Sequence, residues 1–395
     1  MATNEAQIHE AARHGQAPTA KKSGRRIDIR AYTMTIALLT IWLVMFILTK
    51  GVFVSARNLS NLFVQMSIVG VLTTGMVLTI ISGNIDLSVG SLLGMLGGVA
   101  AILQVYYHMN TLLAVVCTLA LGGIVGVVHG AVIAYLRVPA FIVTLGGLMA
   151  YRGALLGVTK GITVSPVNES FRFIGQAYLS KEVGLALTGV AALLLVASAM
   201  LKARRDGRSA PAGADRAAGY AKAVVVPVLV LAFTLVMNQY KGVPIPVVIM
   251  LGIVVVLSFI ANKTVFGRSV YAIGGNKEAA EYSGILVRPI IFGIFVLEGV
   301  LSAVGGLILT ARLNAGTVSA GQNLELDVIA AAVIGGASLA GGVGTVSGAI
   351  LGALVMASLN NGLSVMNVDA FWQFILKGVI LVVAVYIDVL NSDRK

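Results

Sequence analysis

Residues 111–135 read TLLAVVCTLALGGIVGVVHGAVIAY, without a single lysine, arginine, aspartate or glutamate. An α-helix needs about 20 such residues to cross a hydrocarbon core about 30 Å thick. Comparable runs recur along the chain of 395 residues, of which 58% are hydrophobic and 11% charged. Soluble domains average about 25% charged residues. The sequence therefore predicts an all-α, polytopic membrane protein and excludes a soluble enzyme, a disordered protein and a fibrous repeat.

About twelve apolar segments are long enough to be considered as membrane spans. They are 31–49, 64–82, 91–107, 111–135, 140–158, 183–201, 223–240, 247–261, 290–310, 328–340, 345–359 and 374–390. Several are short, glycine-rich or interrupted, and re-entrant or broken helices are the usual alternative for such segments. The expected number of spans is therefore ten to twelve. The first segment exceeds the apolar core of a cleaved signal peptide, so we expect it to be retained.

The basic residues predict the orientation. Lysine and arginine collect in cytoplasmic loops of membrane proteins. Placing the N-terminal tail 1–30 inside puts most of the 28 basic residues there, including those of a basic loop at 202–222 and of the loop 262–289. The transmembrane domain is expected to span 31–390, with 202–222 as a flexible linker and a cytoplasmic C-terminal tail at 391–395. The net charge of +12 then reflects topology and not nucleic-acid binding.

Residues for catalysis or metal binding are not apparent. Cys117 stands alone within an apolar run, and the four histidines share no metal-ligand spacing. Neither HExxH nor GxxxxGK[ST] occurs, so an ATP-dependent process would need another subunit. We expect no catalytic residue, no metal and no cofactor bound by this chain, which is not itself an enzyme.

Loop 262–289 contains a short predicted helix at 276–284. Gly274-Gly275 frees the backbone before it, and Asn276 is a good N-cap residue. Gly284 can close the helix as the residue after its C-cap. About two turns of helix are unstable alone, which favours docking on another surface.

The predicted helix at 276–284 also has one acidic residue in its first turn and a face of small side chains. Glu278 lies in the first turn, where a negative charge suits the helix dipole. Ala279 and Ala280 offer a small-residue face for close approach by a partner. The alternative is an ordinary solvated loop helix.

Polar residues interrupt the apolar pattern at Asn84, Asp86 and Ser88. Polar groups between membrane helices must satisfy backbone or line a wet cavity. Asp86 or Ser88 can cap the following helix, so a structural turn and a role in a transport pathway remain equal alternatives. Glycines spaced four apart at Gly122, Gly126 and Gly130 predict close helix packing.

Glu298 lies in the middle of the span 290–310. A carboxylate at membrane depth costs about 2.5–3.5 kcal/mol on insertion scales, so it should face protein or water. We expect it to bond to a serine one turn on, Ser302, and to be isolated from other acids. His129 is similarly expected to be a hydrogen-bonded core histidine.

A polar run lies on the expected outer side before the segment 328–340. It consists of Gln322, Asn323, Glu325 and Asp327. It can face a partner, guard the entrance of a pathway, or be a solvated loop.

Several motifs resemble the permease subunits of bacterial ABC-type monosaccharide importers. They are GRSVYAIGGNKEAAEYSGI at 267–285, IDLSVGS at 85–91, PAFIVTLGG at 139–147, LELDVIAAAVIGGASLAGGVGT at 324–345, and Asn360-Asn361-Gly362-Leu363 followed by Phe371-Trp372-Gln373. The resemblance covers roughly 50–395. The additional spans at 183–240 and the segment from Lys241 to Pro244 look most like the branch that carries D-xylose; other members carry ribose, arabinose or galactose.

This resemblance implies a homodimer in the bacterial cytoplasmic (inner) membrane, with both termini inside. It implies a cytoplasmic tandem ATPase subunit that uses ATP and magnesium, and a periplasmic sugar-binding protein. The coupling loop received by the ATPase would comprise Arg268, Tyr271, Gly274, Gly275, Asn276, Glu278, Ala279, Ala280, Ser283 and Gly284. The candidates for the substrate pathway are Asn84, Asp86, Ser88, Glu298, Gln322, Asn323, Glu325, Asp327, Asn360 and Asn361.

Three classes of function therefore compete. An ATP-driven sugar permease explains the capped loop helix, whereas an ion-coupled secondary transporter or channel would need several intramembrane carboxylates. A membrane-embedded enzyme is the weakest of the three, because the sequence shows no nucleophile paired with a general base. The sugar itself is open among D-xylose, ribose, arabinose, galactose and other small polyol-like solutes. Neighbouring genes for a tandem ATPase and a secreted binding protein would discriminate the classes.

Overall fold

The computed structural model describes residues 29–206 and 214–392, and its named elements are all helical. The first half contains α2 (Ile29–Leu48), the short turn η1 (Val52–Val54), α3 (Ala56–Ile81), α4 (Val89–Val105), α5 (Thr111–Ala134), α6 (Ala140–Thr159), α7 (Glu169–Gln176) and α8 (Lys181–Asp206). The second half contains α9 (Ala214–Asn238), α10 (Ile245–Lys263), α11 (Val265–Gly275), α12 (Lys277–Tyr282), α13 (Val287–Leu313), α14 (Leu324–Ile334), α15 (Val346–Val365) and α16 (Ala370–Ser392). The prediction of an all-α protein is confirmed. The tails up to residue 28 and from 393 onward, and the segment 207–213, lie outside the described residues.

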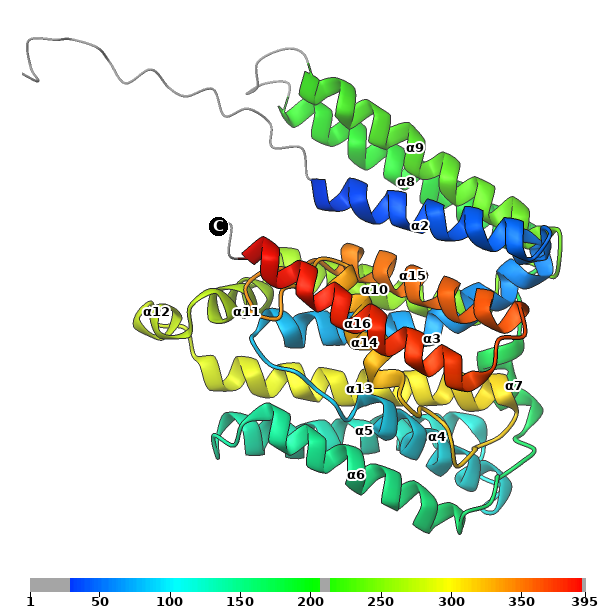
Figure 1. The fold of residues 1–395 in the computed structure, drawn as a ribbon, viewed down its shortest axis with the longest axis vertical. Coiled ribbons are helices and arrows are strands. Elements are labelled where there is room, and N and C mark those ends of the chain that lie inside the picture. Colours follow the sequence, from blue (N-terminus) through cyan, green and yellow to red (C-terminus); the bar gives the residue numbers. More distant parts are fainter. Residues whose placement is uncertain (1–28, 207–213, 393–395) are drawn as a thin grey trace, which may run out of the picture.

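Helix α3 forms the centre of a bundle of roughly parallel helices (Figure 1). Its most apolar stretch is 94% buried, against 22% for α5 and 17% for α6. α3 packs against α10, α13, α14 and α15, and these helices share the largest hydrophobic cluster of the molecule. The helix is therefore enclosed by protein on nearly every side.

The periphery of the bundle is apolar. Large side chains such as Leu193, Val255 and Phe259 are more than half exposed on α8 and α10. Exposed apolar surface on this scale would be unfavourable in water, but it suits contact with lipid. The burial pattern therefore agrees with a membrane-embedded protein.

Six helices are long and apolar enough to cross a membrane among the residues described, namely α3, α5, α6, α10, α13 and α15. Shorter apolar helical stretches occur at Met34–Leu48, Val89–Val105, Val225–Asn238 and Ala370–Tyr386. Each apolar segment of the sequence overlaps a helix, but α14, which overlaps the segment 328–340, has only 11 residues and ends at Ile334. Ten to twelve spans therefore remain a prediction.

Two helices extend further than the sequence indicated. The segment 202–222 was expected to be a flexible linker, but α8 continues to Asp206 and α9 begins at Ala214. The alanines of this segment favour helix, and Gly207 and Pro211 lie outside the described residues. Both ends of the expected linker are therefore helical.

The chain between α14 and α15 is the main interruption of the bundle. Gly336, Gly341, Gly342 and Gly344 all have positive φ there. Left-handed backbone is readily available to glycine and costly for other residues. The expectation of a short or broken helix near 328–340 is therefore confirmed.

Helices α5 and α13 pack through glycine. A Cβ atom at Gly126 would lie 2.6 Å from the carbonyl oxygen of Phe295 and 2.7 Å from Cα of Val296. A Cβ atom at Gly299 would in turn lie 2.9 Å from the backbone nitrogen of Gly126. The small-residue spacing on α5 is thus used for contact within one subunit.

We expect Gly126→Ala to separate α5 from α13 and to destabilise the protein by about 1–3 kcal/mol, as overpacked cores do. Gly123→Ala is the matched control, because its Cβ would meet only Val300 Cγ2 at 3.7 Å. The measurement is the apparent melting temperature of both purified variants in one detergent. Equal melting temperatures would contradict the packing argument.

Candidate functional site

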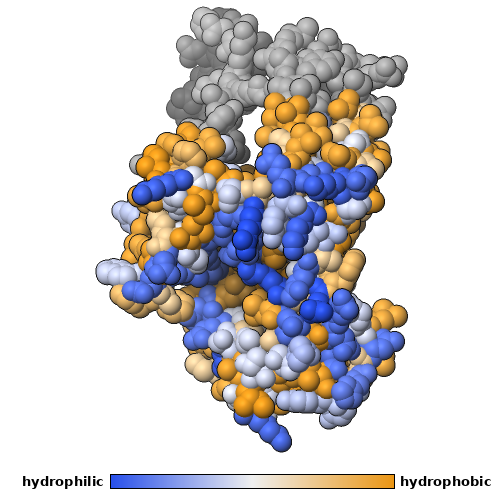
Figure 2. All heavy atoms as spheres, turned by 90° about the vertical axis from the view of Figure 1, so that its right-hand side faces the viewer, coloured by the Kyte–Doolittle hydropathy of each residue, from blue (hydrophilic) through white to orange (hydrophobic). Residues whose placement is uncertain are grey.

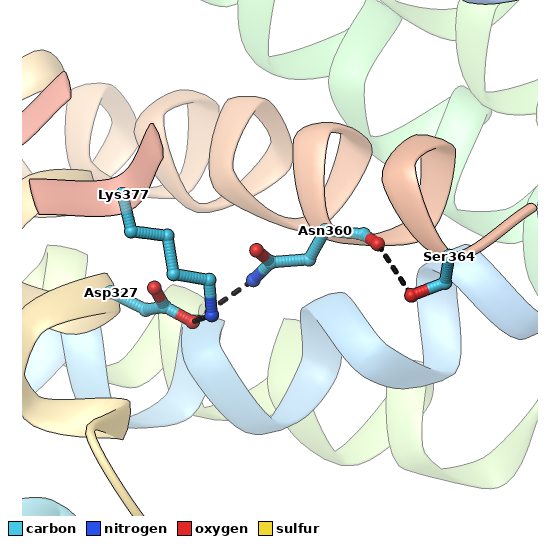
Figure 3. Close-up of polar contacts among 4 residues, drawn as sticks. All are labelled: Asp327, Asn360, Ser364 and Lys377. Atoms are coloured by element: carbon cyan, nitrogen blue, oxygen red, sulfur yellow. Dashed lines mark hydrogen bonds and ion pairs between the residues drawn. The ribbon is translucent and has the colours of Figure 1, made fainter. Parts of the chain in front are cut away.

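A charged cluster joins α14, α15 and α16 inside the bundle (Figure 3). Asp327, in the first turn of α14, is only 3% exposed. Its Oδ2 accepts hydrogen bonds from Lys377 Nζ and from Asn360 Nδ2, each at 2.9 Å. Lys377 compensates the carboxylate charge, which would otherwise be very costly at this depth.

The cluster also has unused hydrogen-bonding capacity. Asp327 Oδ1 and Asn360 Oδ1 are buried and have no partner. The backbone oxygen of Asn360 accepts from Ser364 Oγ at 2.8 Å, which keeps this turn of α15 polar (Figure 3). These two oxygens are acceptors, and each keeps the capacity for a further hydrogen bond.

Asn360 and Asn361 serve different contacts although they are consecutive. Asn361 is 1% exposed, and its Oδ1 accepts from Asn58 Nδ2 at 2.8 Å. The same Asn58 amide donates to the carbonyl oxygen of Phe53 at 2.8 Å. Asn361 thus ties α15 to the start of α3, whereas Asn360 faces Asp327.

The polar run from Gln322 to Asp327 does not form one surface. Gln322 is exposed, and Asn323 adopts a left-handed turn with φ 57°. Glu325 is only 6% exposed and turns into the bundle, where its Oε2 has no partner. A solvated loop is therefore wrong for Glu325 and Asp327, because the start of α14 is enclosed by neighbouring helices.

Asp86 organises the turn before α4. Its Oδ1 accepts from the backbone nitrogen of Ser88 at 2.7 Å and from Ser88 Oγ at 2.6 Å. Ser88 occupies the N-cap position of α4, but its side chain makes no capping bond. Asn84 donates to Ser82 Oγ at 3.0 Å. The structure thus gives all three side chains local bonds, and side-chain capping of α4 by Ser88 is not what it shows.

Glu298 differs from expectation in two respects. It is 1% exposed, and neither of its carboxyl oxygens nor Ser302 Oγ has a partner, so the predicted bond to Ser302 is absent. It is also not isolated, because Asp86 lies within electrostatic range of both Glu298 and His129. His129 Nε2 is hydrogen-bonded to the Tyr151 hydroxyl at 2.7 Å, as expected for a core histidine.

The short loop helix forms as the sequence predicted. Asn276 Oδ1 accepts from the backbone nitrogen of Ala279 at 2.9 Å, which caps α12. Gly284 has φ 82°, and its nitrogen donates to Glu281 O, while Ile285 N donates to Ala280 O, each at 3.0 Å. These two bonds make a Schellman motif. α12 lies at one end of the bundle, beyond α11 (Figure 1).

The predicted small face of α12 is divided between two environments. Ala279 is exposed, but Ala280 is 4% exposed and packs with Ile273 and Val287 of the same chain. Ala280 therefore anchors α12 to its own subunit and is not free to face a partner. The predicted coupling residues that remain exposed are Arg268, Gly275, Asn276, Glu278, Ala279, Ser283 and Gly284.

The opposite end of the bundle has a polar cavity of about 650 Å³. Arg57, Lys241 and Arg312 contribute to its lining, and among the residues that the structure describes no carboxylate does. Arg312 Nη2 donates to Asn61 Oδ1 at 3.2 Å. Figure 2 faces this end and shows hydrophilic residues gathered in its middle. These three cations lie on distant segments of the chain, so the sequence did not predict that they meet.

A family pattern described as the permease component of the branched-chain amino acid transport system matches residues 58–385. The chain belongs to this family of transport permeases. The xylose transport system permease protein XylH of Haemophilus influenzae is 47% identical over 370 residues, covering 94% of this chain and 99% of the relative. XylH of Escherichia coli is 44% identical, covering 94% of each chain, and its ribose import permease protein RbsC is 35% identical, covering 93% and 97%. No solved structure matched.

Lys377 is the residue of this permease's polar cluster that sequence analysis missed. The available signal was a lysine within the apolar run 374–390. A basic residue near the end of a span is ordinarily explained by its side chain reaching the membrane surface. Only the approach of α16 to α14 shows that it pairs with Asp327.

Removing the lysine should expose the cost of the buried carboxylate. We expect Lys377→Met to destabilise the permease by about 3–5 kcal/mol, because Asp327 would keep a buried, uncompensated charge. The double variant Asp327→Asn with Lys377→Met should recover much of that loss. Thermal unfolding of the purified variants measures both effects. A double variant that is no more stable than Lys377→Met alone would contradict the ion-pair account.

Proposed function

We propose that this permease is the membrane subunit of an ATP-binding-cassette importer for D-xylose. The observation that carries the proposal is identity of 47% and 44% to two xylose permeases over nearly the whole chain, against 35% to a ribose permease. A separate subunit would hydrolyse ATP with magnesium, and a binding protein would deliver the sugar. Ribose, arabinose, galactose or another polyol-like solute is the alternative cargo within the same mechanism.

The α12 end of the bundle would receive the ATPase subunit. α12 is a capped helix whose residues Lys277, Glu278, Ala279 and Tyr282 are exposed, and Tyr282 is 91% exposed. A rigid exposed helix anchored by Ala280 can transmit force, whereas a mobile loop would absorb it. Under this proposal the α12 end is cytoplasmic, as the positive-inside rule predicts.

The opposite end would receive the periplasmic binding protein. Its cavity presents three cations and no carboxylate, which favours a partner with acidic side chains. Lys241 Nζ lies 5.7 Å and 5.6 Å from the ring centroids of Tyr178 and Tyr240, so part of this charge is held in place. The two ends therefore differ in the charge and shape of the partner that each would bind.

The sugar would pass between these ends near Asp327, Asn360 and Lys377. A neutral sugar needs hydrogen-bond acceptors and donors rather than rings of charge, and this cluster supplies both. We further propose that two copies form the working permease in the bacterial inner membrane, with the termini of each copy in the cytoplasm. The chain itself is proposed to bind no cofactor.

An ion-coupled secondary transporter is the remaining alternative. The proximity of Asp86, His129 and Glu298 favours it, because proton-coupled transport uses chains of buried ionisable groups. The relatives named above favour the ATP-driven mechanism. The two mechanisms differ in their source of energy, which an uptake assay can separate.

The complete importer should accumulate D-xylose in proteoliposomes only when ATP, the ATPase subunit and the loaded binding protein are all present. Competition by unlabelled pentoses and hexoses then ranks the cargo, and we expect D-xylose to compete most strongly. Dissipating the proton gradient should leave the rate unchanged. Uptake that follows the proton gradient without ATP would refute the ATP-driven mechanism.

Ala279→Arg tests the proposed docking surface. Its bulky charge would stand on the exposed face of α12 without disturbing the buried Ala280. We expect membrane insertion to be normal and copurification with the ATPase subunit to fall at least severalfold. Thr163→Arg adds the same charge at an exposed position outside the coupling loop and is the control. Undiminished copurification of Ala279→Arg would exclude this face from the contact.

A further inference from the structure

The end of helix α11 meets the bundle in a close backbone contact, beside the apolar packing of Val270 and Ile273. We call Ile81, Gly274, Gly342 and Gly344 the glycine junction. A Cβ atom at Gly274 would collide with the carbonyl oxygen of Ile81 and would lie 2.6 Å from the nitrogen of Gly342. Gly342 N in turn donates to Ile81 O at 2.8 Å. The junction therefore brings the end of α3, the end of α11 and the chain between α14 and α15 into backbone contact.

Tyr271 adds a directed bond to this contact. Its hydroxyl donates to the carbonyl oxygen of Gly344 at 2.9 Å. Burial raises the pKa of the Tyr271 phenol, so the group remains a neutral donor at physiological pH. Gly344 has φ 155°, and a Cβ there would lie 2.9 Å from Ile81 Cγ1. The tyrosine hydroxyl thus bonds to a backbone segment that only a small residue can form.

The chain that receives α11 is firmly attached to the transmembrane helices. Ser338 Oγ and Leu339 N donate to Asp388 Oδ2 of α16 at 3.1 and 3.2 Å. A Cβ at Gly335 would lie 2.6 Å from Cα of Ala349, so α14 and α15 are in backbone contact beside the junction. A displacement of the glycine junction would therefore move α14 and α15 together.

Helix α14 connects the glycine junction to the cluster of Asp327, Asn360 and Lys377. α14 has 11 residues, with Asp327 in its first turn and the glycine-rich chain after its last. An α-helix is rigid over about 16 Å, the length of 11 residues at 1.5 Å each. A movement of one end of α14 would therefore displace Asp327, and with it the hydrogen bonds that Asp327 accepts from Asn360 and Lys377.

We infer that the glycine junction is the point at which motion of the coupling loop enters the membrane bundle, and that Tyr271 is a positioning residue for this step. The inference rests on the proposed function, because it presumes an ATPase partner at the α12 end. It reassigns Tyr271 and Gly274 from the surface that binds the partner to a contact inside the permease. Association with the ATPase and transmission to the sugar pathway are then carried by different residues.

The experiment compares association with coupling in the full importer reconstituted in lipid nanodiscs. Tyr271→Phe deletes one hydroxyl and keeps the ring. We expect undiminished copurification with the ATPase subunit, but a stimulation of hydrolysis by xylose-loaded binding protein that is lower by roughly two- to tenfold, the range expected for one lost hydrogen bond. Gly274→Ala should reduce stimulation more strongly, because its Cβ forces the junction apart.

Matched controls keep the result interpretable. Tyr107→Phe alters a tyrosine that is 72% exposed, and Gly252→Ala adds a Cβ that would meet nothing within 4 Å. Both should behave as the wild type. If Gly274→Ala fails to assemble, Tyr271→Phe alone decides the question. Wild-type stimulation in Tyr271→Phe overturns the inference, whereas absence of stimulation in the wild type would instead count against the proposed function.

Discussion

Backbone polar groups at membrane depth must find their partners inside the protein, and this constraint shapes the whole molecule. A helix satisfies this constraint with its own backbone hydrogen bonds. The break after α14 meets it through bonds to other segments: Ser338 N donates to Val343 O at 3.0 Å, and Gly342 N donates to Ile81 O at 2.8 Å. The irregular chain therefore lies where α3, α11 and α16 supply hydrogen-bond partners for it.

Glycine makes this arrangement possible because it lets backbones approach where any side chain would intervene. The α5–α13 contact at Gly126 and the glycine junction at Gly274 both depend on this close backbone approach, but they have different roles. The first lies within the bundle and holds two helices together. The second joins the bundle to the loop that we propose meets the ATPase, so one kind of residue provides both rigidity and transmission.

Charge is compensated in some parts of the molecule and not in others, since Glu298 and Glu325 are buried with oxygens that have no partner. Asp327 is buried but paired with Lys377, whereas the exposed residues of α12 and the cations of the opposite cavity meet water or a partner. The two ends of the molecule thus differ chemically, while its middle offers a compact set of hydrogen-bonding groups. Such a division suits a subunit that receives a sugar at one end and is driven from the other.

Hydropathy, caps and glycine act over a few residues, so they were enough to predict the apolar helices, the capped loop helix and the broken segment near 328–340, but not α7 or α11. The sequence also placed Asp327 and Asn360 among the candidates. Only the tertiary structure decided that Lys377 joins them, that Ala280 is buried, and that Asp86 lies near Glu298. These facts depend on which helix faces which. Membrane helices are apolar on several sides, so their sequences leave that choice to packing.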